Sequence, residues 1–312
     1  MLPRVLLTRR IPSSVFTRLT GQCDVDLYDG EGAIPRPELK RRLADKEGVI
    51  SVLTDKIDAE IMDAGPALKI IANIAVGYDN IDVAAARTRG IIVSNTPDVL
   101  TEAVAEFTWA LILGLARRVA EGDRLIRGDR WETWGLDFML GMELRGKQLG
   151  IIGGGRIGRA VAAKASAFGM TTAIASRGTT HTPGRMSLDE LLVTSDVVSI
   201  HTPLTPETHH LIDRRALARM KRSAMLVNTA RGPVVDEDAL VWALGEHLIA
   251  GAALDVYNKE PDVSLALRQF ENILLTPHLG SATRETRTAM ADLAVRNVLG
   301  VLTGHEALTP VT

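Results

Sequence analysis

A run of glycines in the middle of the sequence has the spacing of a phosphate-binding turn. The segment Gly153-Gly154-Gly155-Arg156-Ile157-Gly158 fits the pattern G-x-G-x-x-G. It follows an apolar run that predicts a strand and opens a helical pattern that continues to about Phe168. In such a motif the first glycine permits a tight turn, the second lets backbone approach a pyrophosphate, and the third lets helix and strand pack closely. The helix N-terminus adds free N–H groups and a positive dipole end. We therefore predict a dinucleotide site, with an ordinary glycine-rich turn as the alternative.

The residues after the next predicted strand favour a coenzyme that carries a 2′-phosphate. A site for NAD normally has Asp or Glu at the end of this strand, where it bonds the ribose hydroxyl. Here the strand leads into Arg177, and no acidic residue occurs until Asp189. An arginine can form charge-assisted hydrogen bonds with a phosphate dianion. Nearby hydroxyls that could add to them belong to Ser176, Thr179 and Thr180. The sequence thus predicts NADP(H), and the alternative is that Arg177 is a solvated surface charge.

Short apolar runs alternate with helical patterns along the whole sequence, as is typical of parallel sheets built from βαβ units. We expect five strands in the first half, over 4–8, 24–28, 48–53, 68–74 and 91–95. Six more are expected over 148–153, 171–176, 197–201, 224–229, 249–255 and 273–275. Helices are expected, among others, over 38–44, over 101–127 as one long element, and over 284–302. The predicted fold class is α/β, with two doubly wound parallel-sheet domains.

The length and the order of these elements indicate two domains. A chain of 312 residues exceeds what one ordinary core supports. The last helix has no strand after it, so we expect it to pack on the first domain. The first domain would then be discontinuous, with residues 1–98 plus 284–312, and residues 99–283 would form the dinucleotide-binding domain.

Composition excludes several classes of protein. Lys plus Arg number 36 and Asp plus Glu 38, so the net charge of −2 argues against a nucleic-acid binder. The single cysteine, Cys23, excludes a disulfide within the chain and fits a reducing compartment. The longest apolar stretch, from Phe107 to Ala116, has ten residues, whereas a bilayer requires about 20. The N-terminal apolar run is also too short for a signal peptide. We expect a cytoplasmic protein that binds neither membrane nor nucleic acid.

Four further motifs carry a resemblance to a known family. They are His201-Thr202-Pro203-Leu204-Thr205-Pro206-Glu207-Thr208, Asn228-Thr229-Ala230-Arg231-Gly232, Ala253-Leu254-Asp255-Val256-Tyr257 and Thr276-Pro277-His278-Leu279-Gly280-Ser281-Ala282-Thr283. In their order they resemble the D-isomer-specific 2-hydroxyacid dehydrogenases, and the likeness includes Ala75-Val76-Gly77-Tyr78-Asp79-Asn80-Ile81-Asp82 in the first half. The resemblance implies a flavodoxin-like substrate domain, a Rossmann cofactor domain and an active-site cleft between them.

The resemblance also implies that Arg231, Glu260 and His278 are the catalytic residues, and chemistry supports each role. Reduction of a 2-keto acid requires a cation for the carboxylate, a proton for the carbonyl oxygen and a hydride for the carbon. The planar guanidinium of Arg231 suits the carboxylate and can polarise the ketone. His278 can donate the proton because its reference pKa lies near neutrality. Glu260 would bond the other imidazole nitrogen and favour the charged ring.

The contacts with coenzyme and substrate follow from the same motifs. Besides the residues named after the second strand, the expected coenzyme contacts are Gly153, Gly155, Arg156, Ile157, Gly158, His201, Thr202, Pro203, Thr208, Thr229, Ala230, Asp255, Gly280, Thr101 and Val104. The backbone N–H groups of Val76 and Gly77 are expected to hold the substrate carboxylate, together with Arg231 and His278. Phosphite dehydrogenases of this family have lysine at the position of Val76, which argues against phosphite. Leu53 is expected to line the cleft, with a plain core role as the equal alternative.

The segment Trp131-Glu132-Thr133-Trp134 resembles that of glyoxylate/hydroxypyruvate reductases, whose second tryptophan reaches the substrate pocket of the partner subunit. We expect a homodimer in which Trp134 acts in trans, and the alternative is a tryptophan simply buried in the dimer interface. The neighbouring His209 and His210 resemble a metal pair, but adjacent helical residues do not face one another. No other ligand cluster accompanies them, so no metal is expected.

The functional hypothesis is an NADPH-dependent reductase of a small 2-keto acid, most similar to glyoxylate/hydroxypyruvate reductases, which give glycolate and D-glycerate. A 2-ketogluconate reductase, or another D-2-hydroxyacid dehydrogenase, would share every motif and differ in pocket volume. A cofactor-sensing transcriptional corepressor on the same fold is the remote alternative from another class. The complete catalytic set argues against it.

Overall fold

The computed structural model describes residues 2–175 and 186–311, which form two compact units. The first comprises Met1–Leu100 and Ala282–Thr312, and the second comprises Thr101–Ser281. Each unit contains one sheet in which all paired strands are parallel. The expected α/β class with two parallel sheets is confirmed.

The sheet of the first unit has the strand order β2-β1-β3-β4-β5. Its strands are β1 (Arg4–Leu7), β2 (Asp24–Leu27), β3 (Gly48–Ser51), β4 (Ile70–Asn73) and β5 (Ile92–Ser94). The helices are α1 (Ser13–Thr20), α2 (Arg36–Leu43), α3 (Ala59–Asp63), α4 (Val83–Thr88) and α11 (Arg284–Leu302). This is the flavodoxin-like order, whose topological switch point lies between β1 and β3.

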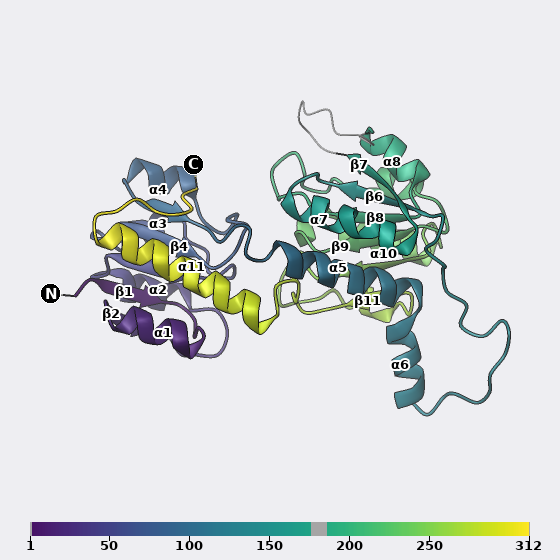
Figure 1. Ribbon diagram of the computed structural model, residues 1–312, viewed down its shortest axis with the longest axis horizontal. Coiled ribbons are helices and arrows are strands. Elements are labelled where there is room, and N and C mark those ends of the chain that lie inside the picture. The colour runs from purple at the N-terminus through teal and green to yellow at the C-terminus, as the bar shows by residue number, and fades with distance from the viewer. Residues whose placement is uncertain (1, 176–185, 312) are drawn as a thin grey trace. The chain divides into compact units, whose positions relative to one another are not determined.

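Alternation of side chains along the strands builds two cores, one on each face of this sheet. Leu6, Val49 and Ile71 pack in one cluster with side chains of α2, α3 and α4. Val5 and Ile50, which point to the opposite face, pack with α1 and with four buried residues of α11. Figure 1 shows α11 in yellow along this face of the sheet. The C-terminal helix therefore packs on the unit that contains the N-terminus.

The sheet of the second unit has the order β11-β10-β9-β8-β6-β7. Its strands are β6 (Gln148–Ile152), β7 (Thr171–Ala175), β8 (Val197–Ile200), β9 (Met225–Asn228), β10 (Gly251–Leu254) and β11 (Ile273–Leu275). The α-helices are α5 (Thr101–Ala116), α6 (Val119–Arg127), α7 (Arg156–Lys164), α8 (Leu188–Thr194), α9 (Arg214–Arg219) and α10 (Glu237–Gly245). The short 3-10 turns are η1 (Ala165–Phe168), η2 (Gly232–Val234) and η3 (Leu267–Gln269). The strand order reverses between β6 and β8, and ligands of such sheets bind at this switch point, beyond the carboxyl ends of the strands.

Two helix predictions were wrong in detail. The long helix expected over 101–127 is interrupted, because Arg118 adopts a left-handed backbone conformation with φ 53°. The backbone N–H of Met142 donates to the carbonyl of Ala116 at 2.8 Å, so a distant segment takes a hydrogen bond that a continuous helix would have used. The helix expected over 38–44 begins at Arg36 with Pro37 inside its first turn, where proline needs no N–H partner.

Candidate active site

The glycine-rich turn joins β6 to α7 at the switch point of the second sheet. Gly153 has φ 104°, and a Cβ atom on it would collide with the carbonyl oxygen of His201, the residue after β8. A Cβ on Gly158 would collide with the carbonyl of Gly153. These two glycines are therefore required by the turn and by close packing of helix and strand.

The middle glycine of the motif is different. A Cβ on Gly155 would meet no atom within 4 Å, and the backbone there has an ordinary φ of −70°. Gly155 is the N-cap of α7, and it offers no side chain to cap the first N–H groups of the helix. Arg156 and Ile157 begin that helix. The open space over uncapped N–H groups fits a pyrophosphate.

Four residues predicted to recognise the 2′-phosphate lie outside the described residues: Ser176, Arg177, Thr179 and Thr180. The strand that leads to them, β7, ends at Ala175 and pairs with β6 in register along its whole length.

The loop after β8 contains His201, Thr202 and Pro203. Nε2 of His201 lies 2.8 Å from the hydroxyl of Ser199, and burial lowers the pKa of His201 to about 3, so the ring is neutral near pH 7. The buried Thr208 donates from Oγ1 to the carbonyl of Pro203 at 2.7 Å. It also accepts from the backbone N–H of Thr205 at 2.7 Å. The hydrogen bonds of the Thr208 side chain therefore fix the backbone of this loop.

The carboxylate of Asp255, after β10, organises the backbone that leads to His278. It accepts hydrogen bonds from the Thr276 hydroxyl at 2.6 Å, from Leu279 N at 2.7 Å and from Gly280 N at 2.8 Å. Burial raises the pKa of Asp255, although these three donors and the nearby His278 oppose the rise.

The N-terminal part of α5 lies close to the Asp255 carboxylate. A Cβ on Gly280 would lie 3.4 Å from Oδ2 of Asp255 and 3.5 Å from a methyl of Val104. Val104 is buried one turn into α5, which begins at Thr101. Three of the predicted coenzyme contacts, namely Val104, Asp255 and Gly280, are therefore neighbours in space.

Glu260 and His278 form a direct pair. Oε2 of Glu260 lies 2.8 Å from Nδ1 of His278, and Oε1 accepts from Tyr257 N at 3.1 Å. Burial alone would raise the pKa of Glu260, but the hydrogen bond and charge of His278, the Tyr257 N–H and the charge of Arg231 together lower it. The carboxylate therefore stays ionised near pH 7 and accepts from the ring.

The backbone of His278 is left-handed, with φ 54°. Such a conformation costs roughly 1–2 kcal/mol in a residue with a Cβ atom. Two hydrogen bonds from His278 N hold it, to the carbonyls of Asp255 at 3.0 Å and Thr276 at 3.1 Å. The surrounding structure fixes an unfavourable backbone, which is common where a side chain must be aimed.

Arg231 lies in a turn after β9. Nδ2 of Asn228 donates to the carbonyl of Arg231 at 2.9 Å, and Oδ1 of Asn228 accepts from Ala230 N at 3.0 Å. The hydroxyl of Thr229 lies 3.1 Å from that of Thr108 on α5. A Cβ on Gly232 would collide with the backbone of Tyr257, so the Arg231 turn packs against the segment that carries Glu260.

Sequence reasoning did not assign three residues that position this site. Asn228 closes the Arg231 turn, Thr276 bonds the Asp255 carboxylate, and Tyr257 N–H holds Glu260. Asn228 and Thr276 stand inside motifs that were recognised, and a polar side chain at a strand end was the available signal. No side-chain pattern could reveal the backbone N–H of Tyr257.

The predicted substrate contacts of the first unit follow strands β3 and β4. Leu53 is half-buried and does not belong to the buried core clusters of the described residues. Val76 and Gly77 lie in a bend after β4, and within the part of the chain that the structure describes their backbone N–H groups donate no hydrogen bond. Such N–H groups are available to an anion.

Trp134, which was predicted to act in a partner subunit, lies at the surface. Trp134 is 71% exposed, on the loop after α6.

Within residues 2–175 and 186–311 no group of three or more His, Cys, Asp or Glu side chains could hold a metal ion. His209 and His210 lie in a turn and their rings stack, with centroids 4.0 Å apart, so the expectation that adjacent helical side chains would keep them from facing one another was wrong. No helix among the described residues is long and apolar enough to span a membrane.

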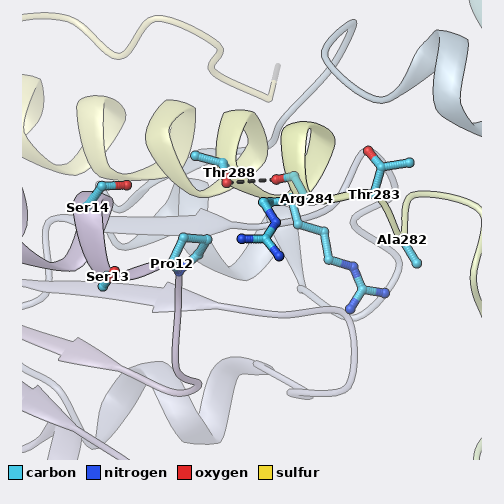
Figure 2. Close-up of a pocket in the computed structure, with 8 residues that line it drawn as sticks. Pro12, Ser13, Ser14, Ala282, Thr283, Arg284 and Thr288 are labelled. Atoms are coloured by element: carbon cyan, nitrogen blue, oxygen red, sulfur yellow. Dashed lines mark hydrogen bonds between the residues drawn. The ribbon is translucent and has the colours of Figure 1, made fainter.

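A hollow of about 480 Å³ lies on the first unit between the first turns of α1 and α11 (Figure 2). It is lined by Pro12, Ser13, Ser14, Ala282, Thr283, Arg284, Arg287 and Thr288. The hydroxyl of Thr288 donates to the carbonyl of Arg284 at 2.7 Å. None of the predicted site residues lines this hollow.

The fold and site of the second unit define a dinucleotide-binding domain of the Rossmann type. Residues 109–280 match the family described as D-isomer specific 2-hydroxyacid dehydrogenase, NAD binding domain. The glyoxylate reductase of Thermofilum pendens is 49% identical over 313 residues, which cover 97% of this chain and 92% of that protein. That of Thermococcus onnurineus is 44% identical over 317 residues, covering 98% and 94%.

A solved structure gives the same result for the fold. The NADPH-dependent glyoxylate/hydroxypyruvate reductase of Sinorhizobium meliloti, in complex with NADP and malonate, superposes with a TM-score of 0.90 and 36% identity. The match covers 100% of this chain and 97% of that one. The chain belongs to the D-isomer specific 2-hydroxyacid dehydrogenase family, as its motifs predicted.

Proposed function

We propose that this dehydrogenase reduces glyoxylate or hydroxypyruvate, forming glycolate or D-glycerate, and that NADPH is its coenzyme. The observation that carries the proposal is the contact of 2.8 Å between Glu260 and His278, close to the Arg231 turn. In this arrangement His278 is the proton donor and the Glu260 carboxylate holds its ring. The charge of the Arg231 guanidinium lowers the pKa of Glu260 and so acts on the same pair. The names of the relatives support the choice of substrate.

The residues that would hold the coenzyme are those of the glycine turn and the loops beside it. The uncapped start of α7 fits the pyrophosphate, and the neighbouring group of Asp255, Gly280 and Val104 fits the nicotinamide end. A bound nicotinamide coenzyme supplies the hydride for the carbonyl carbon.

The side chains divide the remaining chemistry among them. Glu260 occupies Nδ1 of His278, which leaves Nε2 as the ring nitrogen that gives its proton to the carbonyl oxygen. Arg231 binds the carboxylate of the keto acid and polarises the carbonyl. The N–H groups of Val76 and Gly77 receive the same carboxylate, and Leu53 lines the pocket. The first unit is then the substrate domain and the second the coenzyme domain.

The coenzyme preference rests on the residues that follow β7. An acid there would repel a 2′-phosphate, and Arg177 offers a cation instead. A charged hydrogen bond contributes roughly 1.5–3 kcal/mol, so one arginine favours NADPH by about one to two orders of magnitude. The test is kcat/KM for both coenzymes at saturating glyoxylate, in the wild type and in Arg177→Ala. A wild-type ratio near one would contradict the proposal.

The substrate is tested by a screen of NADPH oxidation with glyoxylate, hydroxypyruvate, 2-ketogluconate and pyruvate. The proposal requires the highest kcat/KM with glyoxylate or hydroxypyruvate. A preference for 2-ketogluconate would instead indicate a sugar-acid reductase that shares the same catalytic side chains. Absence of turnover with every keto acid would favour a coenzyme-sensing corepressor.

We further propose that the enzyme works as a cytoplasmic homodimer. The single cysteine of the sequence is compatible with a reducing compartment. An exposed apolar surface on α6 and the loop after it supports the dimer, and it consists of Val119, Ile126, Trp131, Trp134, Leu136, Phe138 and Leu140. Figure 1 shows α6 and this loop extending away from the sheet of the second unit. Exposed large apolar side chains gathered in one segment favour an interface.

A further inference from the structure

The bend that carries Val76 and Gly77 is held by side-chain amides. Nδ2 of Asn95, the residue after β5, donates to the carbonyl of Val76 at 2.8 Å. Nδ2 of Asn73, the last residue of β4, donates to the carbonyl of Gly77 at 3.0 Å. The successive carbonyls of Val76 and Gly77 therefore each accept a hydrogen bond from an asparagine amide, and the two asparagines lie at the ends of two different strands.

A third asparagine connects this bend with the neighbouring loop. Oδ1 of Asn80 accepts from Nδ2 of Asn73 at 3.1 Å. Nδ2 of Asn80 donates to the carbonyls of Asp55 at 2.9 Å and Val52 at 3.3 Å, on either side of Leu53. The loops after β3 and β4, which carry all three predicted substrate contacts of the first unit, are thus fixed to each other.

The base of this network is buried at the switch point between β1 and β3. The carboxylate of Asp55 accepts from the Thr8 hydroxyl at 2.5 Å and from Val52 N at 3.0 Å. Asp55 and Thr8 are both almost completely buried. The hydrogen bonds hold the backbone of the β3 loop rigidly, because neither group can exchange its partner for bulk water.

A hydrogen bond that holds a carbonyl also fixes the direction of the N–H group in the same peptide. A trans peptide is planar, so its N–H points opposite to its C=O. The carbonyl of Ala75, held by Thr96 N at 2.9 Å, fixes the direction of the Val76 N–H. The carbonyl of Val76, held by Asn95, fixes that of the Gly77 N–H. Both N–H groups are directed away from these partners, and neither donates to any other described residue.

The backbone of Asn95 is held by the C-terminal segment. Its backbone N–H donates to the carbonyl of Thr309 at 3.3 Å, and its carbonyl accepts from the Thr309 hydroxyl at 2.6 Å. Ser94 also forms an antiparallel bridge with Pro310. The C-terminal segment therefore holds the residue that holds Val76.

We propose that Asn95 is a positioning residue that directs the N–H of Gly77 toward the substrate carboxylate, and that Asn73 supports the same bend through the next carbonyl, that of Gly77. The inference rests on the proposed function, since it assumes that this bend receives the keto acid. A hydrogen bond to the carbonyl also polarises its peptide and strengthens the N–H as a donor. The two asparagines act on binding of the carboxylate and not on transfer of the proton, which belongs to His278.

The test compares Asn95→Ala with the wild type in steady-state kinetics with glyoxylate. Loss of one positioning hydrogen bond should raise KM by up to about tenfold. We expect kcat at saturating glyoxylate and Kd for NADPH to stay within about twofold, because binding in ground state and transition state weakens equally. Oxalate, a non-reacting carboxylate, should show a Ki that rises by the same factor.

Two further variants separate positioning from folding. Asn272→Ala removes an amide that also donates to a backbone carbonyl, that of Ala250 at 3.0 Å, at the amino end of β11. It should leave KM unchanged. Asn73→Ala provides a second test if Asn95→Ala is poorly folded. A purely structural role would lower the folded fraction and the apparent kcat without changing KM.

The outcomes distinguish this inference from the proposed function. An active wild type together with unchanged KM and Ki in folded Asn95→Ala and Asn73→Ala would overturn the inference alone. A wild type that reduces no keto acid, but binds oxalate more tightly than Asn95→Ala in calorimetry, would overturn the proposed function and support the anion receptor.

Discussion

Oε2 of Glu260 lies 2.8 Å from Nδ1 of His278, although eighteen residues separate them in the sequence. The same carboxylate is held on its other oxygen by Tyr257 N, so it cannot rotate away from the ring. The pair therefore fixes both the orientation of the imidazole and the nitrogen that remains for a substrate.

We predict that His278→Ala lowers kcat with glyoxylate by about 10²–10⁴, the usual contribution of a general acid. Kd for NADPH should hardly change, because the ring has no role in coenzyme binding. His247→Ala is a matched control, since His247 is an exposed histidine of the same unit with a left-handed backbone of φ 52°. Near-full turnover in His278→Ala would exclude His278 as the proton donor.

Glu260→Gln should lower kcat of glyoxylate reduction. The amide keeps the shape but loses the charge-assisted contact that orients the His278 ring. A hydrogen bond to a charged group contributes roughly 1.5–3 kcal/mol, so kcat should fall by about tenfold or more. An unchanged kcat in a folded variant would show that Glu260 does not orient the donor.

The same variant tests a pH dependence of stability. The pKa of Glu260 is lower in the folded protein than its reference value of 4.5. Its ionised form thus adds stability that is complete above the unfolded pKa and is lost as pH falls through the folded pKa. The difference in Tm between wild type and Glu260→Gln should be larger at pH 7 than near pH 3. A difference that does not vary with pH would contradict this assignment.

For Arg231 we predict that replacement by Ala raises KM for glyoxylate and lowers kcat together, because the guanidinium serves both binding and polarisation. Lysine should rescue poorly, since an ammonium lacks the planar fork. Arg219→Lys, at a surface arginine that faces Asp189 at 3.6 Å, is the control. Unchanged kinetics in Arg231→Lys would argue against bidentate binding.

Gly155, the N-cap of α7, and Gly158, in its first turn, should respond differently to replacement by alanine. In Gly155→Ala the new methyl meets no protein atom, so Tm should change by less than about 2 °C while Kd for NADPH rises about tenfold or more. In Gly158→Ala the methyl collides with the Gly153 carbonyl, so Tm should fall by several degrees through overpacking of roughly 1–3 kcal/mol. Unaltered coenzyme affinity in Gly155→Ala would place the pyrophosphate elsewhere.

The apolar surface on α6 and its following loop predicts a homodimer at micromolar concentration, measurable by light scattering. If Trp134 acts in trans, Trp134→Ala and His278→Ala are defective in different subunits of one site. An equimolar mixture of the two variants should then regain about a quarter of the wild-type activity, since about half of its dimers are mixed and each mixed dimer contains one intact site of two. A monomeric wild type would remove both claims, and mixing without recovery would confine Trp134 to its own subunit or to the interface.

Much of the fold could be predicted because its determinants are local. Eleven strands are confirmed near their expected positions, since short apolar runs bounded by turn residues select strands wherever they occur. Gly153 and Gly158 were predictable for a similar reason, because only glycine satisfies such a turn. The helix over 101–127 was wrong because it is interrupted at Arg118, and the Ala116 carbonyl pairs with Met142, a residue outside the pattern.

The candidate site divides in the same way. The sequence by itself determined which side chains are chemically suited to the reaction, because residue type and motif order are properties of the chain. Only the tertiary structure decided that Tyr257 N holds Glu260, that Asn228 closes the Arg231 turn, and that Asn95 fixes Val76. The contact of Asn95 with Val76 joins the ends of two strands, and it arises only when the parallel strands align and bring their carboxyl ends to one edge of a sheet. The other two contacts each span three residues, in turns that pack against each other where Gly232 meets the backbone of Tyr257.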